Sequence, residues 1–301
     1  MIRISCIRVV IHSNAWVYII HLCYIFFTRY ARNYTYSLHS CKHTLGVGMD
    51  NVDIVYVVKH DEHNTDLKYS LRSLAWVTGY RKIWIAGYKP SWVSDLVGSI
   101  PVEQLDVKTK WMNSVNNIKQ ACYTNEVTDN FVLFNDDFFT ARIGLDIRVE
   151  SNYCRGTIDQ SIERYTSKED SRWRHSFTVA KEILTNFHCK HFDNFALHVP
   201  MLLNKHKVLT LLNNFVLSRY VRKYQMLPFR NIYGNIYWNH PQSMRDGKIL
   251  LGHDVTDERL QACKWISVPD GVTDNLMQYP KLYSLLRSYP ASPYITGDKI
   301  V

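Results

Sequence analysis

The 301-residue sequence lacks any clean apolar stretch of about 18 residues, the length needed for a transmembrane helix, so a protein with several membrane spans is excluded. Glycine and proline are scarce, at 12 and 9 residues, which excludes collagen-like and Pro/Gly-rich low-complexity chains. At 46% hydrophobic residues the chain is too apolar to be intrinsically disordered. Its length suits one large domain or two small ones with a substantial core.

Acidic residues are absent from residues 1–48, which hold five Lys or Arg residues and over half of the net charge of +9. Residues 15–27 form a 13-residue apolar run that contains a histidine, and this is short for a membrane span. Three interpretations are open: a signal anchor, a cleaved signal peptide, or an extension upstream of a fold that begins at Met49. We favour the extension, because acidic residues and a strand pattern both begin just after Met49. We therefore expect a leader over 1–48, one domain over 49–301 and no stable membrane span.

Paired cysteine motifs and the common nucleotide-binding and nucleophile motifs are also missing. The seven cysteines are widely spaced without a C-x-x-C, which disfavours a disulfide framework or a cysteine-rich zinc site and fits a reducing compartment. No G-x-x-x-x-G-K-[ST], G-x-G-x-x-G or G-x-S-x-G occurs. P-loop, Rossmann dinucleotide and α/β-hydrolase chemistry are therefore disfavoured.

Strand and helix patterns alternate over residues 52–134, which indicates an open, mainly parallel α/β sheet with helices on both faces. Beyond residue 140 the pattern is mostly helical, which predicts a helical C-terminal elaboration. The expected strands are 52–58, 82–87, 101–104, 131–134 and 264–268, and the expected helices are 67–77, 112–123, 157–188 and 204–217. In such sheets ligands bind at the carboxyl ends of the strands.

Asn135, Asp136 and Asp137 directly follow the apolar strand predicted at 131–134. Two adjacent carboxylates at the end of a buried strand repel each other and lose solvation, and a divalent cation removes that penalty. Mg²⁺ or Mn²⁺ is usually held by one or two carboxylates together with substrate phosphates. The sequence therefore predicts a metal and diphosphate site here; the alternative is a solvated turn capped by the Asp side chains.

Four further residues are candidates for donor binding. Asp53, early in the first strand, could contact a ribose or a base, or simply cap a loop. Arg72 suits bidentate phosphate recognition, although by composition alone a solvated helix face is the commoner explanation. Asn113 and Ser114 lie at a predicted helix start, where free backbone N–H groups favour phosphate oxygens or where the side chains cap the helix.

Two residues from the second half of the chain are candidates for the reacting centre. His198 lies in an extended segment before Pro200, and a neutral histidine near a sugar hydroxyl could act as a general base. Arg230 could bind phosphate or stack on a neighbouring ring. A structural role is the alternative for both.

Taken in order, several sequence blocks resemble the Stealth family of sugar-phosphate transferases of bacterial capsule synthesis. The blocks are Asp53-Ile-Val-Tyr56, Asp66-Leu-Lys-Tyr-Ser-Leu-Arg-Ser-Leu74, Arg81-Lys-Ile-Trp-Ile-Ala-Gly87, Pro90-Ser-Trp92, Asn113-Ser114, Phe131-Val-Leu-Phe-Asn-Asp-Asp-Phe-Phe139, His198-Val-Pro-Met-Leu-Leu-Asn-Lys205, Pro228-Phe-Arg230 and, more weakly, Lys264-Trp-Ile-Ser-Val-Pro-Asp-Gly271. One block departs, because the family's Trp-Val-Asp-Gly is here Val57-Val58-Lys59-His60. That shorter form is more similar to glycosyltransferase-like proteins of bacteriophages.

The resemblance implies a GT-A-like fold and assigns roles to the candidate residues. Asp136 and Asp137 would lie at the metal and the diphosphate, with Asp137 also at the reacting centre beside His198 and Arg230. The remaining candidates, Asp53, Arg72, Asn113, Ser114 and Asn135, would line the donor site.

The leading hypothesis is a metal-dependent glycosyltransferase that transfers a sugar from a nucleotide-sugar donor to an acceptor hydroxyl. A Stealth-type sugar-1-phosphate transferase is the first alternative, and a non-catalytic nucleic-acid-binding module is the second. The expected acceptor is a polysaccharide or another glycan, with modified DNA as a further class. The expected location is the cytoplasm, of a bacterial host if the chain is phage-encoded, or a membrane surface if residues 15–27 are a true signal anchor.

Overall fold

The computed structural model describes residues 51–105, 110–166, 171–238 and 241–298. The leader predicted over 1–48 lies outside these ranges. Across the described ranges, no helix combines the length and the apolar character required to cross a membrane.

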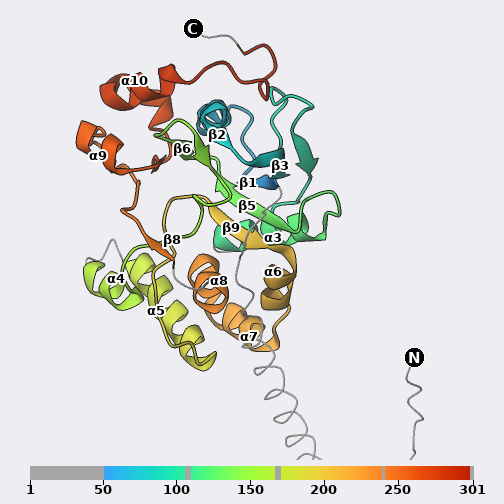
Figure 1. Ribbon diagram of the computed structural model, residues 1–301. Helices are drawn as coiled ribbons and strands as arrows, with labels where there is room; N and C mark the ends of the chain where they lie inside the picture. Colours follow the sequence, from blue (N-terminus) through green and yellow to red (C-terminus); the bar gives the residue numbers. More distant parts are fainter. Residues whose placement is uncertain (1–50, 106–109, 167–170, 239–240, 299–301) are drawn as a thin grey trace, which may run out of the picture. The chain divides into compact units, whose positions relative to one another are not determined.

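A five-stranded sheet with the strand order β4-β3-β1-β5-β9 forms the centre of the structure (Figure 1). Its strands are β1 (Val52–Val58), β3 (Tyr80–Gly87), β4 (Gly98–Ile100), β5 (Asn130–Asn135) and β9 (Met201–Asn204). Four strands run parallel, and only the edge strand β9 pairs antiparallel, with Leu133 opposite Met201 and Asn130 opposite Asn204. The prediction of an open, mainly parallel sheet is confirmed.

Helices cover both faces of this sheet, so six of the seven residues of β1 are buried. The even-numbered residues of β1 share one core with Leu67 and Leu71 of α2 (Thr65–Ser73). Helix α3 (Lys110–Tyr123) packs against β1 and β3. Since successive side chains of a strand point to opposite faces, the odd-numbered residues of β1 face α3. A strand buried on both sides reads as a continuous apolar run, which is why β1 and β5 could be predicted.

The part of the chain beyond residue 140 is mainly helical, as expected, and three short two-stranded pairs among the described residues lie outside the central sheet. Its helices are α4 (Ile158–Arg164), α5 (Ser171–Asn186), α6 (Lys205–Leu212), α7 (Phe215–Tyr224), α8 (Phe229–Tyr237), α9 (Asp257–Ala262) and α10 (Pro280–Ser288). The pairs are β6 (Phe138–Thr140) with β11 (Trp265–Ser267), β8 (Tyr153–Cys154) with β10 (Gln242–Ser243), and β2 (Val77–Thr78) with β7 (Leu145–Asp146). The predicted late strand at 264–268 is therefore present as β11.

Several boundaries differ from the sequence prediction, among them those of the helix expected over 157–188, which is divided into α4 and α5. The third strand is β4, at 98–100 rather than 101–104, because Pro101 cannot donate a ladder hydrogen bond. The helix expected over 204–217 is interrupted at Asn214, whose side chain accepts from two backbone N–H groups and starts α7. The helix expected over 67–77 ends at Ser73, and a short 3₁₀ turn and β2 follow it.

Candidate active site

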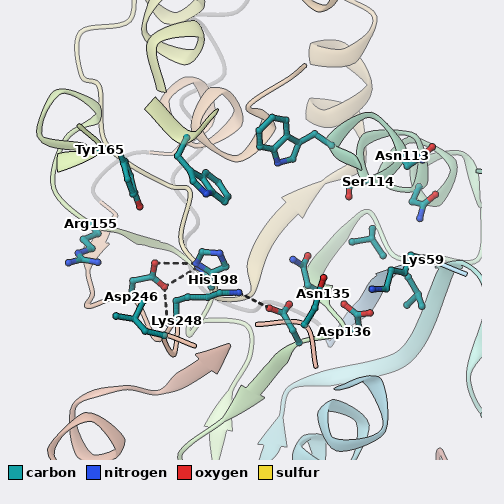
Figure 2. Close-up of a pocket in the computed structure, with 18 of the residues that line it drawn as sticks. Lys59, Asn113, Ser114, Asn135, Asp136, Arg155, Tyr165, His198, Asp246 and Lys248 are labelled. Carbon is teal, nitrogen blue, oxygen red and sulfur yellow. Dashed lines mark hydrogen bonds and ion pairs between the residues drawn. The ribbon is translucent and has the colours of Figure 1, made fainter. Parts of the chain in front are cut away.

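A pocket of about 750 Å³ lies at the carboxyl ends of β1 and β5 (Figure 2). Val57, Val58 and Lys59 reach it from β1 and the turn that follows, and Asn135 and the two residues after it reach it from β5. The opposite wall comes from residues far away in the sequence. Of the sequence-predicted site residues, the pocket brings together Asn113, Ser114, Asn135, Asp136, Asp137 and His198.

The two adjacent carboxylates are anchored in different directions. Asp136 Oδ2 accepts a hydrogen bond from Asn64 Nδ2 at 2.8 Å. Asp137 Oδ2 accepts one from Ser267 Oγ at 2.5 Å and lies 3.6 Å from Lys248 Nζ. Burial, and secondarily the charge of Asp137, raises the pKa of Asp136 to about 6. The pair is therefore held rigidly while its negative charge is only partly compensated by the protein.

This donor set suits a magnesium or manganese ion that is completed by substrate oxygens. Two carboxylates and the side-chain amide of Asn135 lie in succession at one strand end, and hard cations take oxygen ligands of this kind. The described residues contain no group of three or more His, Cys, Asp or Glu side chains placed to hold a metal by themselves. The residues present thus fit a cation shared with a diphosphate better than a metal site made of protein ligands alone.

His198 is oriented by an aspartate that the sequence did not reveal. His198 Nδ1 lies 3.2 Å from Asp246 Oδ2, and the His198 backbone N–H donates to Asp246 Oδ1 at 3.3 Å. Burial disfavours the charge of Asp246, but these bonds to His198 and the backbone N–H of Lys248 hold the pKa of its carboxyl below the usual value. The imidazole, whose side chain is 25% exposed, therefore has one nitrogen fixed by an anion while its ring lines the pocket.

Arg230 lies behind His198 and is not among the residues that line the pocket. Its Nη1 donates to the carbonyl oxygens of Leu197 at 3.1 Å and Val199 at 2.7 Å, the two neighbours of His198. Burial lowers the pKa of Arg230 to about 10, with the charges of Asp137 and Asp246 acting in the opposite sense. Arg230 is therefore cationic at neutral pH and holds the segment around His198 through these bonds, while its catalytic role stays a prediction.

The start of α3 forms the other end of the pocket. Asn113 binds the backbone N–H and carbonyl of Leu105, so its side chain secures the neighbouring loop while it lines the pocket beside Ser114. Asn117, which is 3% exposed, donates to Ala86 O at 2.9 Å, and its Oδ1 has no partner among the described residues. Gly87 makes this arrangement possible, because its φ is +119° and a Cβ would lie 2.9 Å from Asn117 Nδ2.

Asp53 and Arg72 are not among the residues that line the pocket, and their donor-binding roles stay predictions. Asp53 is fully buried at the amino end of β1, where it accepts hydrogen bonds from Arg81, Trp84 Nε1 and the Thr128 backbone. Arg72 forms a two-pronged ion pair with Asp298, of which one bond measures 2.9 Å. Both are charged residues with an internal ion-pair partner, an arrangement that differs from the loop cap and the solvated helix face considered as alternatives from the sequence.

Basic residues that the sequence did not single out also line the pocket. The pocket lining includes Lys59, Arg155, Arg164, Arg245, Lys248 and Arg259, against Asp136, Asp137, Asp246 and Asp270. Six cations against four carboxylates favour an anionic ligand. No local motif marks these cations, because they come from separate turns that only the fold brings together.

Asp66 is a partly buried carboxyl group near the site whose charge should lower the stability of the protein. It accepts from Thr273 Oγ1 at 2.6 Å, and burial, together with Asp136, Asp137 and Asp270, raises its pKa to about 7. A carboxyl group whose pKa is higher in the folded state than in the unfolded state makes the protein less stable as the pH rises. The loss of stability occurs between the pKa of the unfolded state and the pKa of the folded state.

We therefore expect Asp66→Asn to raise the free energy of unfolding by on the order of 2 kcal/mol at pH 8. The gain should shrink steadily as the pH falls through 7 towards 4. Urea denaturation of both proteins in chelator, at several pH values, measures this difference, with the exposed Asp95→Asn as the control. A gain that does not change with pH would contradict the prediction.

Comparison with known proteins gives similarities to solved structures alone, since no protein-family model and no curated protein matches the chain. One similar structure is the galactosyltransferase LgtC in complex with donor and acceptor sugar analogues, at 11% identity and a TM-score of 0.45, with 80% of this chain and 98% of that chain covered. The glycosyltransferase GlyE of Streptococcus pneumoniae TIGR4 is similar at 10% identity and a TM-score of 0.36, with 66% and 46% covered. The bifunctional glycosyltransferase WbbM is similar at 11% identity and a TM-score of 0.41, with 74% and 47% covered.

Proposed function

We propose that the chain is an enzyme, a glycosyltransferase with a GT-A-like fold that moves a sugar from a nucleotide-sugar donor to an acceptor hydroxyl. The observation that carries the proposal is that one pocket contains two sets of residues suited to different parts of the reaction. A carboxylate pair and several cations lie at the carboxyl ends of the parallel strands, and the His198–Asp246 pair lies in the same pocket. The first group suits a diphosphate with its cation, and the second suits activation of a hydroxyl.

The nucleotide would lie at the start of α3. The unpartnered Oδ1 of Asn117 is a buried acceptor that a base or ribose donor group would satisfy. Trp111, on the same helix, lines the pocket and offers a ring against which a base could stack. The diphosphate would then extend towards Lys59 and Lys248, which approach the carboxylate pair from two sides (Figure 2).

Asp136 and Asp137 would hold a magnesium or manganese ion together with the diphosphate, and the ion supplies positive charge for the leaving group. Lys248, 3.6 Å from Asp137, adds a fixed cation at the same place. Because these charges are positioned before the reaction, they stabilise the developing diphosphate without reorganisation.

His198 would act as the general base. Asp246 fixes Nδ1, so Nε2 is the nitrogen left to accept the proton of the acceptor hydroxyl. The hydroxyl oxygen forms a bond to the anomeric carbon, the bond from that carbon to the donor phosphate oxygen breaks, and the nucleoside diphosphate leaves. Asp246 stabilises the imidazolium that results, which is the role a buried aspartate plays beside a catalytic histidine.

The released nucleotide tests the proposal and separates it from sugar-1-phosphate transfer. We expect the full chain, incubated with a panel of UDP-, GDP- and CDP-sugars and Mn²⁺, to release a nucleoside diphosphate from at least one donor, with water or glycan mixtures as acceptors. Chromatography identifies the nucleotide, and the same reactions in chelator measure metal dependence. Release of a nucleoside monophosphate with the phosphate retained on the sugar would assign the Stealth-type reaction. The absence of both release and nucleotide binding would contradict the proposal.

A further inference from the structure

A small second pocket opens beside His198, on the side away from the carboxylate pair. It shares His198, Asp246, Arg155, Arg164, Tyr165 and Trp173 with the main pocket. Figure 2 shows Tyr165 and Arg155 on one side of His198, and Asn113, Ser114 and Lys59 on the other. The catalytic histidine of the proposed reaction therefore lies between two differently built regions of one cavity.

Aromatic rings form part of this second region. Trp173 is 38% exposed, and its ring lies edge-to-face with His198 at a centroid distance of 6.4 Å. Tyr165 is stacked on Phe177 with centroids 5.7 Å apart and planes inclined by 10°, so that ring is held in place from behind. Fixed rings with an exposed face suit the C–H face of a pyranose, which gains dispersion and apolar contact there.

Two guanidinium groups accompany the rings. Arg155 follows β8 and is partly buried, whereas Arg164 lies in the last turn of α4 and is exposed. Among the described residues, no carboxylate forms an ion pair with either side chain, although both line the two pockets. Arginine is the side chain best suited to planar, bidentate recognition of phosphate or carboxylate.

We propose that this region, formed by Arg155, Arg164, Tyr165 and Trp173, is the acceptor subsite and that the acceptor is an anionic glycan. The inference rests on the proposed function. The sugar that carries the attacking hydroxyl packs on Trp173 or Tyr165, and a phosphate or carboxylate on the same or the adjacent sugar binds the two arginines. His198, at the border of the two regions, receives the hydroxyl proton as the new glycosidic bond forms.

Direct binding tests the subsite without knowledge of the natural acceptor. Isothermal titration calorimetry measures the binding of four compounds to the full chain saturated with UDP and Mg²⁺. The compounds are glucose 6-phosphate, methyl glucuronide, methyl glucoside and inorganic phosphate. We expect at least one anionic sugar to bind about tenfold or more tightly than methyl glucoside and than inorganic phosphate, since a hydrogen bond to a charged group contributes about 1.5–3 kcal/mol. Whichever of glucose 6-phosphate and methyl glucuronide binds more tightly shows whether the subsite prefers a phosphate or a carboxylate.

The double variant Arg155→Ala/Arg164→Ala should remove this preference while UDP binding and the midpoint temperature of unfolding stay unchanged. Arg219→Ala/Arg222→Ala, which removes the same charge from exposed positions of α7, is the matched control and should bind as the wild type does. Equal binding of the neutral sugar, equal binding of phosphate alone, or anionic binding that survives in the double variant would overturn the inference. Failure of the proposed function has a different signature, namely no nucleotide binding and no donor cleavage by the wild type.

Discussion

Replacement of both Asp136 and Asp137 by asparagine is expected to lower sugar transfer by at least about a thousandfold, the scale of effect seen when a group that stabilises transition-state charge is removed. Asparagine preserves the size of each side chain and can still accept from Asn64 and Ser267, so the fold should persist. The test is to measure the rates of donor cleavage and sugar transfer with the donor that the panel of nucleotide sugars identifies.

The metal assignment is checked in the same experiment by a readout other than turnover. Calorimetry of a nucleoside diphosphate with and without Mn²⁺ should show metal-enhanced binding by the wild type and none by the double variant. Asp95→Asn/Asp129→Asn removes the same charge from two exposed positions and should leave both quantities unchanged. Transfer by the Asp136/Asp137 variant within a fewfold of the wild type would refute the assignment.

His198→Ala is expected to lower kcat by about 10²–10⁴-fold, the usual contribution of a general base, with little change in the KM for the donor. In the proposed site the diphosphate binds to other residues, so ground-state binding of the donor should persist. Added imidazole should restore part of the rate, because it replaces the missing base without repairing any packing defect.

Asp246→Asn separates orientation from proton acceptance. The amide removes the anion that fixes Nδ1, so kcat should fall while the histidine itself remains, and imidazole should give no rescue. His191→Ala, a histidine on an exposed turn outside the pocket, is the control. A fall in donor affinity that equals the fall in kcat would instead place His198 in donor binding.

The strands β1 and β5 of the central sheet could be predicted because burial on both faces leaves a nearly continuous apolar run in each of them. The edge strand β9 was not predicted, since it has only four residues and continues directly into α6. Its role in the sheet depends on pairing with residues about 70 positions earlier.

The same difference between local and long-range information explains which residues of the site could be predicted from the sequence. Asn135 to Asp137 were predictable because they end a strand whose neighbours are buried. The partner of His198 lies 48 residues away at Asp246, and no spacing rule connects them. The ion pairs of Asp53 with Arg81 and of Arg72 with Asp298 were also not predictable, because a charged residue in the sequence does not disclose which residue is its partner.

The antiparallel direction of β9 determines where the proposed base is delivered. With Met201 opposite Leu133, the residues just before β9 and the residues just after β5 emerge at one edge of the sheet, so His198 arrives beside Asp136 and Asp137. A parallel strand in the same place would have carried the imidazole to the opposite edge. A slip of one residue in this pairing would displace it by about 3.3 Å and turn alternate side chains to the other face of the sheet. The position of the proposed base therefore depends on the alignment of a four-residue strand. Small insertions or deletions just before Met201 should leave the protein folded but lower its turnover.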